Sequence, residues 1–165
     1  MRCIVLVGPM GAGKTTLGKK LAKALDLPFS DTDKLVEKTH GPITKIFETE
    51  GETTFRDYEE KALAAALATG GVVATGGGIV LREANRQALG NHQVVFLDTN
   101  SDSVIKRVNL LKRPLLKDNP ERWQDIYNER LELYKSVAQE TLFTGNRPIK
   151  SLLEELKAKV GKHGN

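Results

Sequence analysis

A glycine-rich loop near the start of the chain has the residue types that bind a phosphate chain. It matches the pattern Gly-x4-Gly-Lys-Ser/Thr at every position, as Gly8-Pro9-Met10-Gly11-Ala12-Gly13-Lys14-Thr15. In such a loop, backbone N–H groups converge on phosphate oxygens, and the helix that follows adds its partial positive charge. Lys14 then reaches the β- and γ-phosphates, and the Thr15 hydroxyl ligates magnesium. The alternative is a glycine-rich turn that precedes a helix by chance.

Two carboxylates, Asp31 and Asp33, follow a second predicted strand and are the next candidates for chemistry. We expect Asp31 to serve a magnesium ion, through water, and Asp33 to orient or deprotonate a substrate hydroxyl. Aspartate is also a good N-cap, so both residues could instead only begin the next helix. Their expected position beside the phosphate site favours the functional interpretation.

Arg56 and Glu59 are three residues apart, so they share one face of a predicted helix. Judged by spacing alone, they form an ordinary solvent-exposed ion pair, worth a few tenths of a kcal/mol. The pattern by itself therefore assigns neither residue to a site.

Three consecutive glycines, Gly76, Gly77 and Gly78, follow the third predicted strand. Glycines in a row cost backbone entropy and contribute nothing to packing, so they suit a place where a ligand approaches the main chain closely. A merely flexible turn is the alternative.

Asp98 ends the fourth predicted strand, where many phosphate-loop proteins carry a magnesium-binding acid. We favour a structural role, in which Asp98 or Thr99 opens the next helix. Arg113 lies in a charged loop with two prolines, residues 112–120. A mobile arginine there could fold over the γ-phosphate and neutralise charge during phosphoryl transfer, although a solvated loop is the alternative. Trp123 and Tyr134 are expected to be core or lid packing.

The elements that must position these groups alternate regularly along the chain. Strands are predicted at 3–7, 28–30, 72–75, 94–97 and 141–144, with helices between them, including long ones at 53–69 and 121–138. Leu17 and Leu21 recur at helical spacing after the glycine loop, until Pro28 ends that helix. Short strands alternating with helices predict a three-layer α/β/α fold around a parallel sheet. Ligands in such sheets gather at the carboxyl ends of the strands.

Composition limits the classes of protein that the chain can belong to. Its 165 residues predict one domain, and Cys3 is the only cysteine, so we expect a reducing, cytoplasmic location. No apolar run approaches the length of a membrane span. The net charge of +4 comes without a long basic block, which argues against a nucleic-acid partner.

Taken together and in order, these motifs resemble those of the shikimate kinase family over essentially the whole chain. The resemblance is carried by the phosphate loop, Asp31-Thr32-Asp33, Gly51-Glu52 with Phe55-Arg56 and Glu59, Ala74-Thr75-Gly76-Gly77-Gly78, and Arg113-Pro114-Leu115-Leu116. It implies ATP-dependent phosphorylation of the 3-hydroxyl of shikimate, in the biosynthesis of aromatic amino acids. It also implies a parallel sheet in the strand order 2-3-1-4-5, a substrate-binding region at about 32–60 and a mobile lid at about 110–122.

The same resemblance implies roles for individual residues. The expected catalytic residues are Lys14, Asp33 and Arg113. The expected ATP contacts are Gly11, Ala12, Gly13, Lys14, Thr15, Thr16, Arg107, Arg113 and Arg147. The expected shikimate contacts are Asp33, Arg56, Gly76, Gly77, Gly78 and Arg130, of which the two arginines hold the carboxylate. Mg²⁺ is the expected cofactor, at Thr15 and Asp31, and the enzyme is expected to be a monomer whose partners are ATP and shikimate.

Two other functions remain open at this level. One is a different small-molecule kinase of the same fold, acting on gluconate or on a nucleoside monophosphate. The other is a catalytically silent nucleotide-binding module. A nucleotide acceptor would need more phosphate-binding arginine residues and a pocket for its base. An enzyme that has lost its activity usually lacks a catalytic group, whereas Lys14, Asp33 and Arg113 are all present here.

Overall fold

The structure is a computed structural model that describes residues 2–111 and 120–163, with the backbone alone at 107–111, 120, 162 and 163. Within these residues it forms a five-stranded parallel sheet in the order β2-β3-β1-β4-β5. The strands are β1 (Ile4–Val7), β2 (Phe29–Asp31), β3 (Val72–Ala74), β4 (Gln93–Asp98) and β5 (Glu140–Phe143). The predicted α/β class and the strand order are confirmed.

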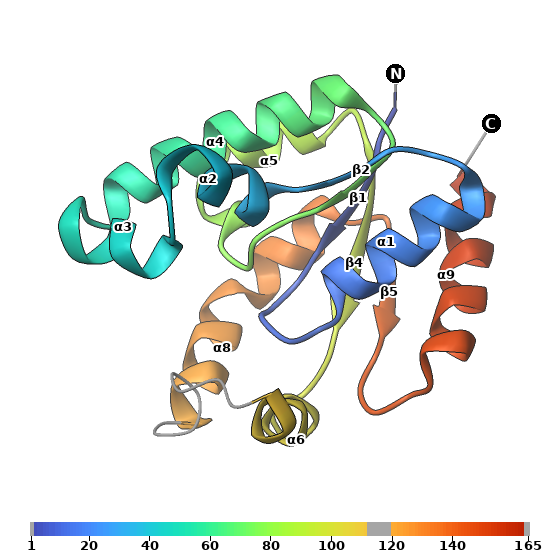
Figure 1. Ribbon diagram of the computed structural model, residues 1–165. Coiled ribbons are helices and arrows are strands. Elements are labelled where there is room, and N and C mark those ends of the chain that lie inside the picture. The colour runs from blue at the N-terminus through green and yellow to red at the C-terminus, as the bar shows by residue number, and fades with distance from the viewer. Residues whose placement is uncertain (1, 112–119, 164–165) are drawn as a thin grey trace.

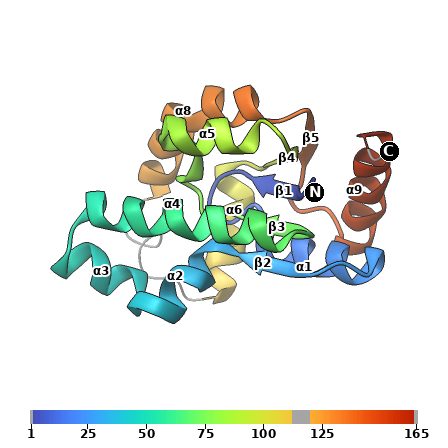
Figure 2. The ribbon, with the colours of Figure 1, turned by 90° about the horizontal axis from the view of Figure 1, so that it is seen from above.

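Helices cover both faces of this sheet, as the three-layer prediction requires. The helices α1 (Lys14–Leu25) and α9 (Ile149–His163) pack side by side on one face. The other face is covered by α4 (Glu52–Thr69), α5 (Glu83–Leu89) and α8 (Pro120–Val137). Side chains alternate along β1, so that Leu6 packs under α1 while Val5 and Val7 pack on the opposite face. Figures 1 and 2 show the two helical layers, one on each face of the sheet, from perpendicular directions.

A smaller helical unit stands beside the sheet. It consists of α2 (Thr32–His40), α3 (Ile43–Thr49) and the first turns of α4, and it lies to the left of the sheet in Figure 1. Its own small core is formed by Val36, Ile46, Phe55 and Ala62. Residues 32–60, which we expected to bind substrate, therefore have a packing centre of their own.

The ends of the strands and of the two long helices agree with the predicted ends to within one residue. A short 3₁₀ turn, η1 (Ile79–Leu81), joins β3 to α5. The helix α6 (Ser101–Leu111) departs from the prediction at its start, because Asn100 Oδ1 accepts the Ser103 N–H at 2.9 Å. Neither Asp98 nor Thr99 begins this helix, so that expectation was wrong. The N-cap is Asn100, whose side-chain oxygen accepts the N–H of Ser103 in the first turn.

The carboxyl ends of β1, β2 and β3 meet at one edge of the sheet. Leu6 of β1 and Asp31 of β2 both pair with Ala74 of β3, which brings the segments that follow these strands together. Thr75, directly after β3, holds them there by donating its backbone N–H and its hydroxyl to the Leu6 carbonyl, at 3.2 and 2.8 Å. The parallel register thus gathers the glycine loop, the aspartate pair and the three glycines.

No helix in residues 2–111 and 120–163 combines the length and the apolar character that a membrane span needs.

Candidate functional site

The glycine loop holds its lysine buried at the start of α1. Gly11 and Gly13 have φ angles of 86° and 95°, a region that side chains disfavour, so the tight turn depends on glycine at both positions. Lys14 is 8% exposed, and its ammonium donates to the Gly8 carbonyl across the loop. Burial lowers the pKa of Lys14 to about 8, although the nearby carboxylates of Asp33 and Asp31 oppose this shift. The loop therefore holds the Lys14 ammonium away from water, and an anionic ligand would stabilise its charged form.

Asp31 caps α2, one of the two roles that its sequence position left open, and its second carboxylate oxygen faces the phosphate loop. One carboxylate oxygen caps α2, because Oδ1 accepts the N–H groups of Asp33 at 3.0 Å and Lys34 at 3.3 Å. The other oxygen, Oδ2, accepts the Thr15 hydroxyl at 2.7 Å. A hydroxyl and a carboxylate oxygen thus meet beside the phosphate loop, and oxygen ligands of this kind are those that Mg²⁺ prefers.

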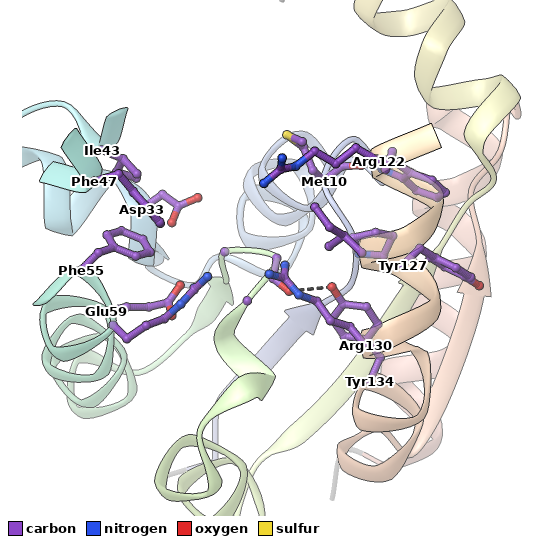
Figure 3. A pocket seen from close by; sticks show the side chains of 17 residues that line it. Met10, Asp33, Ile43, Phe47, Phe55, Glu59, Arg122, Tyr127, Arg130 and Tyr134 are labelled. Atoms are coloured by element: carbon purple, nitrogen blue, oxygen red, sulfur yellow. Dashed lines mark hydrogen bonds and ion pairs between the residues drawn. The ribbon is translucent and has the colours of Figure 1, made fainter. Parts of the chain in front are cut away.

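Asp33 lies where two cavities meet. The smaller cavity, of about 450 Å³, is lined by the phosphate loop and by Asp31. The larger, of about 730 Å³, lies between α4 and α8 (Figure 3). Among the described residues, four line both cavities: Met10, Asp33, Ile43 and Gly77. Burial raises the pKa of Asp33, while Lys14 opposes the shift.

The larger cavity receives an arginine from each of the two helices beside it. Arg56 comes from α4 and Arg130 from α8, and both line the cavity wall. Arg56 Nη1 bonds Glu59 Oε1 at 3.0 Å, and Glu59 is only 1% exposed. The expectation of an ordinary solvent-exposed pair was therefore wrong, because α4 turns this face toward the glycine turn after β3 rather than toward water. Burial raises the pKa of Glu59, and Arg56 opposes that shift.

The three glycines after β3 leave room for functional side chains. A Cβ on Gly76 would lie 2.6 Å from Asp33 Oδ1, and a Cβ on Gly78 would collide with the Arg56 guanidinium. At Gly77 the nearest atoms would be 3.6 Å away, at Arg130 Nη1 and the Met10 nitrogen. Close packing, rather than flexibility, thus explains Gly76 and Gly78, and Gly77 is open toward the cavity.

Two aromatic residues of α8 join the site without any signal in the sequence. The Trp123 indole N–H donates to the Met10 carbonyl at 2.8 Å, and the Tyr134 hydroxyl donates to the Gly77 carbonyl at 2.6 Å. Figure 3 shows Tyr134 and Arg130 side by side on this helix, with Phe55 and Glu59 across the cavity on α4. The cavity wall also includes residues to which the sequence assigned no role in binding, namely Met10, Ile43, Phe47, Arg122, Ile126 and Tyr127.

A sequence model described as shikimate kinase matches residues 10–160, which include most of the phosphate loop, the aspartate pair, Arg56 and Arg130. The chain belongs to the shikimate kinase family. Relatives in this family include the shikimate kinase of Salinispora arenicola, 46% identical over 93% of this chain and 95% of the relative. Another is the shikimate kinase of Pseudomonas fluorescens, 46% identical over 90% of each chain.

Solved structures of the shikimate kinase family have the same fold. The shikimate kinase of Acinetobacter baumannii, solved in complex with shikimate, is 38% identical and covers 99% of this chain, with a TM-score of 0.90 over 94% of that protein. The shikimate kinase of Aquifex aeolicus is 30% identical, with a TM-score of 0.81, covering 99% of this chain and 98% of that one. A gluconokinase from Sinorhizobium meliloti has a TM-score of 0.68, covering 98% of this chain and 92% of that one. At 20% identity, this likeness shows a shared fold alone.

The remaining residues expected to contact ATP lie away from these cavities or outside the described side chains. Arg113, with most of the expected lid, lies outside the described residues, and the side chain of Arg107 is not described. Arg147 donates to the Phe143 carbonyl at 3.0 Å and forms an ion pair with Glu155. Its expected contact with ATP stays a prediction.

Asp98 serves a structural purpose other than the one expected of it. Its Oδ1 accepts the Tyr127 hydroxyl at 2.7 Å and its neighbour's N–H at 2.8 Å, so it connects α8 to the end of β4. Its carboxylate thus accepts one hydrogen bond from α8 and one from the backbone directly after β4.

Proposed function

We propose that the chain transfers the γ-phosphoryl group of ATP to the 3-hydroxyl of shikimate, giving shikimate 3-phosphate and ADP. The observation that carries this proposal is that the two cavities share a wall, which includes Asp33 and Gly77 together with Met10 and Ile43. A triphosphate held by the phosphate loop and an acid held by the arginines would meet at this shared wall. The hydroxyl oxygen attacks phosphorus, the bond to the ADP oxygen breaks, and the hydroxyl proton leaves toward Asp33 or is only oriented by it.

The chain's own charged groups divide the work of binding and transfer. The guanidinium groups of Arg56 and Arg130 are suited to grip one carboxylate, because their planar N–H groups form paired hydrogen bonds. Lys14 would neutralise charge on the phosphates during transfer. Positioning and charge neutralisation supply most of the rate in this class of reaction.

Mg²⁺ fits the residues beside the phosphate loop. Thr15 would hold it directly and Asp31 through water, consistent with their hydroxyl and carboxylate oxygens lying 2.7 Å apart. When bound with ATP, the ion supplies charge neutralisation on the phosphate oxygens. We also propose Arg113 as a lid residue over the γ-phosphate, and a monomer in the cytoplasm.

A panel of acceptors tests the substrate. ADP formation should depend strongly on added shikimate and stay low with gluconate, with a nucleoside monophosphate or with no acceptor. A faster reaction with gluconate or with the monophosphate would show that the acceptor is wrong while leaving the phosphate site intact. Binding of ATP without turnover on any acceptor would favour a silent nucleotide-binding module.

Arg56→Lys is expected to raise the KM for shikimate about 10- to 100-fold, because a lysine keeps the charge but loses the paired hydrogen bonds. The KM for ATP should stay the same. Initial rates at varied shikimate and ATP measure both constants. The matched control is Arg82→Lys, whose ion pairs with Asp57 and Glu60 lie outside both cavities. Equal effects of the two substitutions on the KM for shikimate would remove Arg56 from the acid pocket.

The KM for shikimate is expected to rise on acidification through the titration of Glu59. Its pKa is raised by burial, so the carboxylate that holds Arg56 is lost at a higher pH than an ordinary glutamate would lose it. Glu59→Gln should have a KM that is about 10-fold higher at neutral pH and flatter with pH. Kinetics between about pH 8 and about pH 5 provide the test. A KM that rises equally in the variant and in the wild type would assign the titration to another group.

A further inference from the structure

One face of α8 carries a stripe of four side chains, at Trp123, Tyr127, Arg130 and Tyr134. Their spacing of four, three and four residues places them one above another on the helix surface. All four line the larger cavity. This stripe therefore runs along the larger cavity from the phosphate loop, at Trp123, to the glycine turn, at Arg130 and Tyr134.

The first residue of the stripe holds the phosphate loop. Trp123 is 4% exposed and donates its indole N–H to the Met10 carbonyl at 2.8 Å. Its ring stacks on Tyr127, with centroids 5.1 Å apart and planes 15° from parallel. Tyr127 is tied in turn to the end of β4 through Asp98. The indole is thus fixed from two sides, and its one polar atom points at the backbone of the loop.

The last residue of the stripe holds the glycine turn. Tyr134 is fully buried, and its hydroxyl donates to the Gly77 carbonyl at 2.6 Å. Its ring packs on Phe96 of β4, with centroids 5.2 Å apart. Arg130 is close enough to act on the pKa of this hydroxyl, lowering it against the larger upward effect of burial. Tyr134 and Arg130 thus reach the turn that borders both cavities side by side (Figure 3).

We propose that Trp123 and Tyr134 are positioning residues that fix the distance between the γ-phosphate of ATP and the acceptor hydroxyl. They do so by bonding the phosphate loop and the glycine turn to one face of α8. This inference rests on the proposed function. The two loops come from different strands, and the stripe bonds a backbone carbonyl in each to the same helix. Because a misplacement of about 1 Å can cost about 10²-fold in rate, a helix that fixes both loops has a direct effect on transfer.

Loosening either bond has a specific chemical consequence. When the acceptor hydroxyl is out of line, water can take the γ-phosphoryl group instead, giving ADP and inorganic phosphate. The ratio of ADP to shikimate 3-phosphate then rises above one. A loss of folded protein lowers both products together and leaves the ratio unchanged, so the ratio separates positioning from stability.

Tyr134→Phe tests the glycine-turn end. It should lower kcat by about 10- to 100-fold, leave the dissociation constants of ATP and shikimate within about threefold, and raise the ratio of ADP to shikimate 3-phosphate. The matched control is Tyr58→Phe, which also removes a 2.6 Å hydroxyl bond, to Glu50, but lies outside both cavities. The control should keep the wild-type kcat and ratio, and Tm values correct for stability.

Trp123→Phe tests the phosphate-loop end, because phenylalanine keeps an aromatic surface for Tyr127 and removes the N–H donor. It should raise the ratio of ADP to shikimate 3-phosphate as Tyr134→Phe does. If Tyr134→Phe does not fold, the ratio measured for Trp123→Phe alone tests the inference. Ratios and kcat values that match the Tyr58→Phe control in both variants would overturn the inference while shikimate turnover by the wild type still supports the proposed function. A wild type that does not phosphorylate shikimate would instead overturn the proposed function.

Discussion

Replacing Lys14 with methionine is expected to lower kcat by about 10³-fold, which is the scale of removing a charge that faces the developing transition state. Methionine has a similar length and fills the same buried space, so the fold should survive. At pH 7 the wild type carries a cation whose pKa burial has lowered to about 8, which means that folding has opposed this charge. We therefore expect a Tm for the variant that is no lower than that of the wild type.

Steady-state kinetics with saturating shikimate, together with thermal unfolding, measure both parts of this result. Lys19→Met is the control, because Lys19 lies on the same helix but is exposed to solvent. It should leave kcat and Tm close to the wild-type values. A Lys14→Met variant that kept more than about a tenth of the wild-type kcat would contradict the assignment of Lys14 to the transferring phosphate.

Asp33→Asn is expected to lower kcat by about 10²- to 10⁴-fold, the range attributed to general acid–base catalysis, with a smaller effect on the KM for shikimate. Asparagine keeps the shape and a hydrogen bond to the acceptor hydroxyl but cannot take its proton. Burial raises the pKa of Asp33, so the wild-type kcat should fall on acidification at a higher pH than for an ordinary aspartate. The variant should lack this fall.

The profile of kcat against pH is the deciding measurement. Asp57→Asn is a suitable control, because Asp57 pairs with Arg82 at 2.7 Å on the exposed side of α4. A variant of Asp33 that keeps near-normal kcat would show that this carboxylate is not needed as a base. A lowered kcat with an unchanged pH profile would assign it to orientation alone.

Local patterns were enough to predict the architecture and the phosphate loop. Strands buried in a parallel sheet read as short continuous apolar runs, and the Lys14 loop needs only a strand, a turn and a helix that are adjacent in the chain. Asp31 shows the limit of such a pattern. Its N-cap role follows from its own helix, but its contact with Thr15 depends on how β1 and β2 are placed on either side of β3.

The surroundings of the acid pocket depended on the tertiary structure. The spacing of Arg56 and Glu59 indicates a shared helix face, but whether that face meets water or the glycine turn depends on how α4 packs against the sheet. The same holds for Trp123, whose bond joins residues 113 positions apart, and for Tyr134, whose bond spans 57.

The sequence by itself therefore determined which elements form, the phosphate loop and the family resemblance, because each depends on neighbouring residues or on their order. Only the tertiary structure decided which polar groups are buried together and which carbonyls the aromatic side chains of α8 hold. Burial and hydrogen-bond partners are properties of segments brought together by folding, and the separation of those segments in the chain carries no local signal.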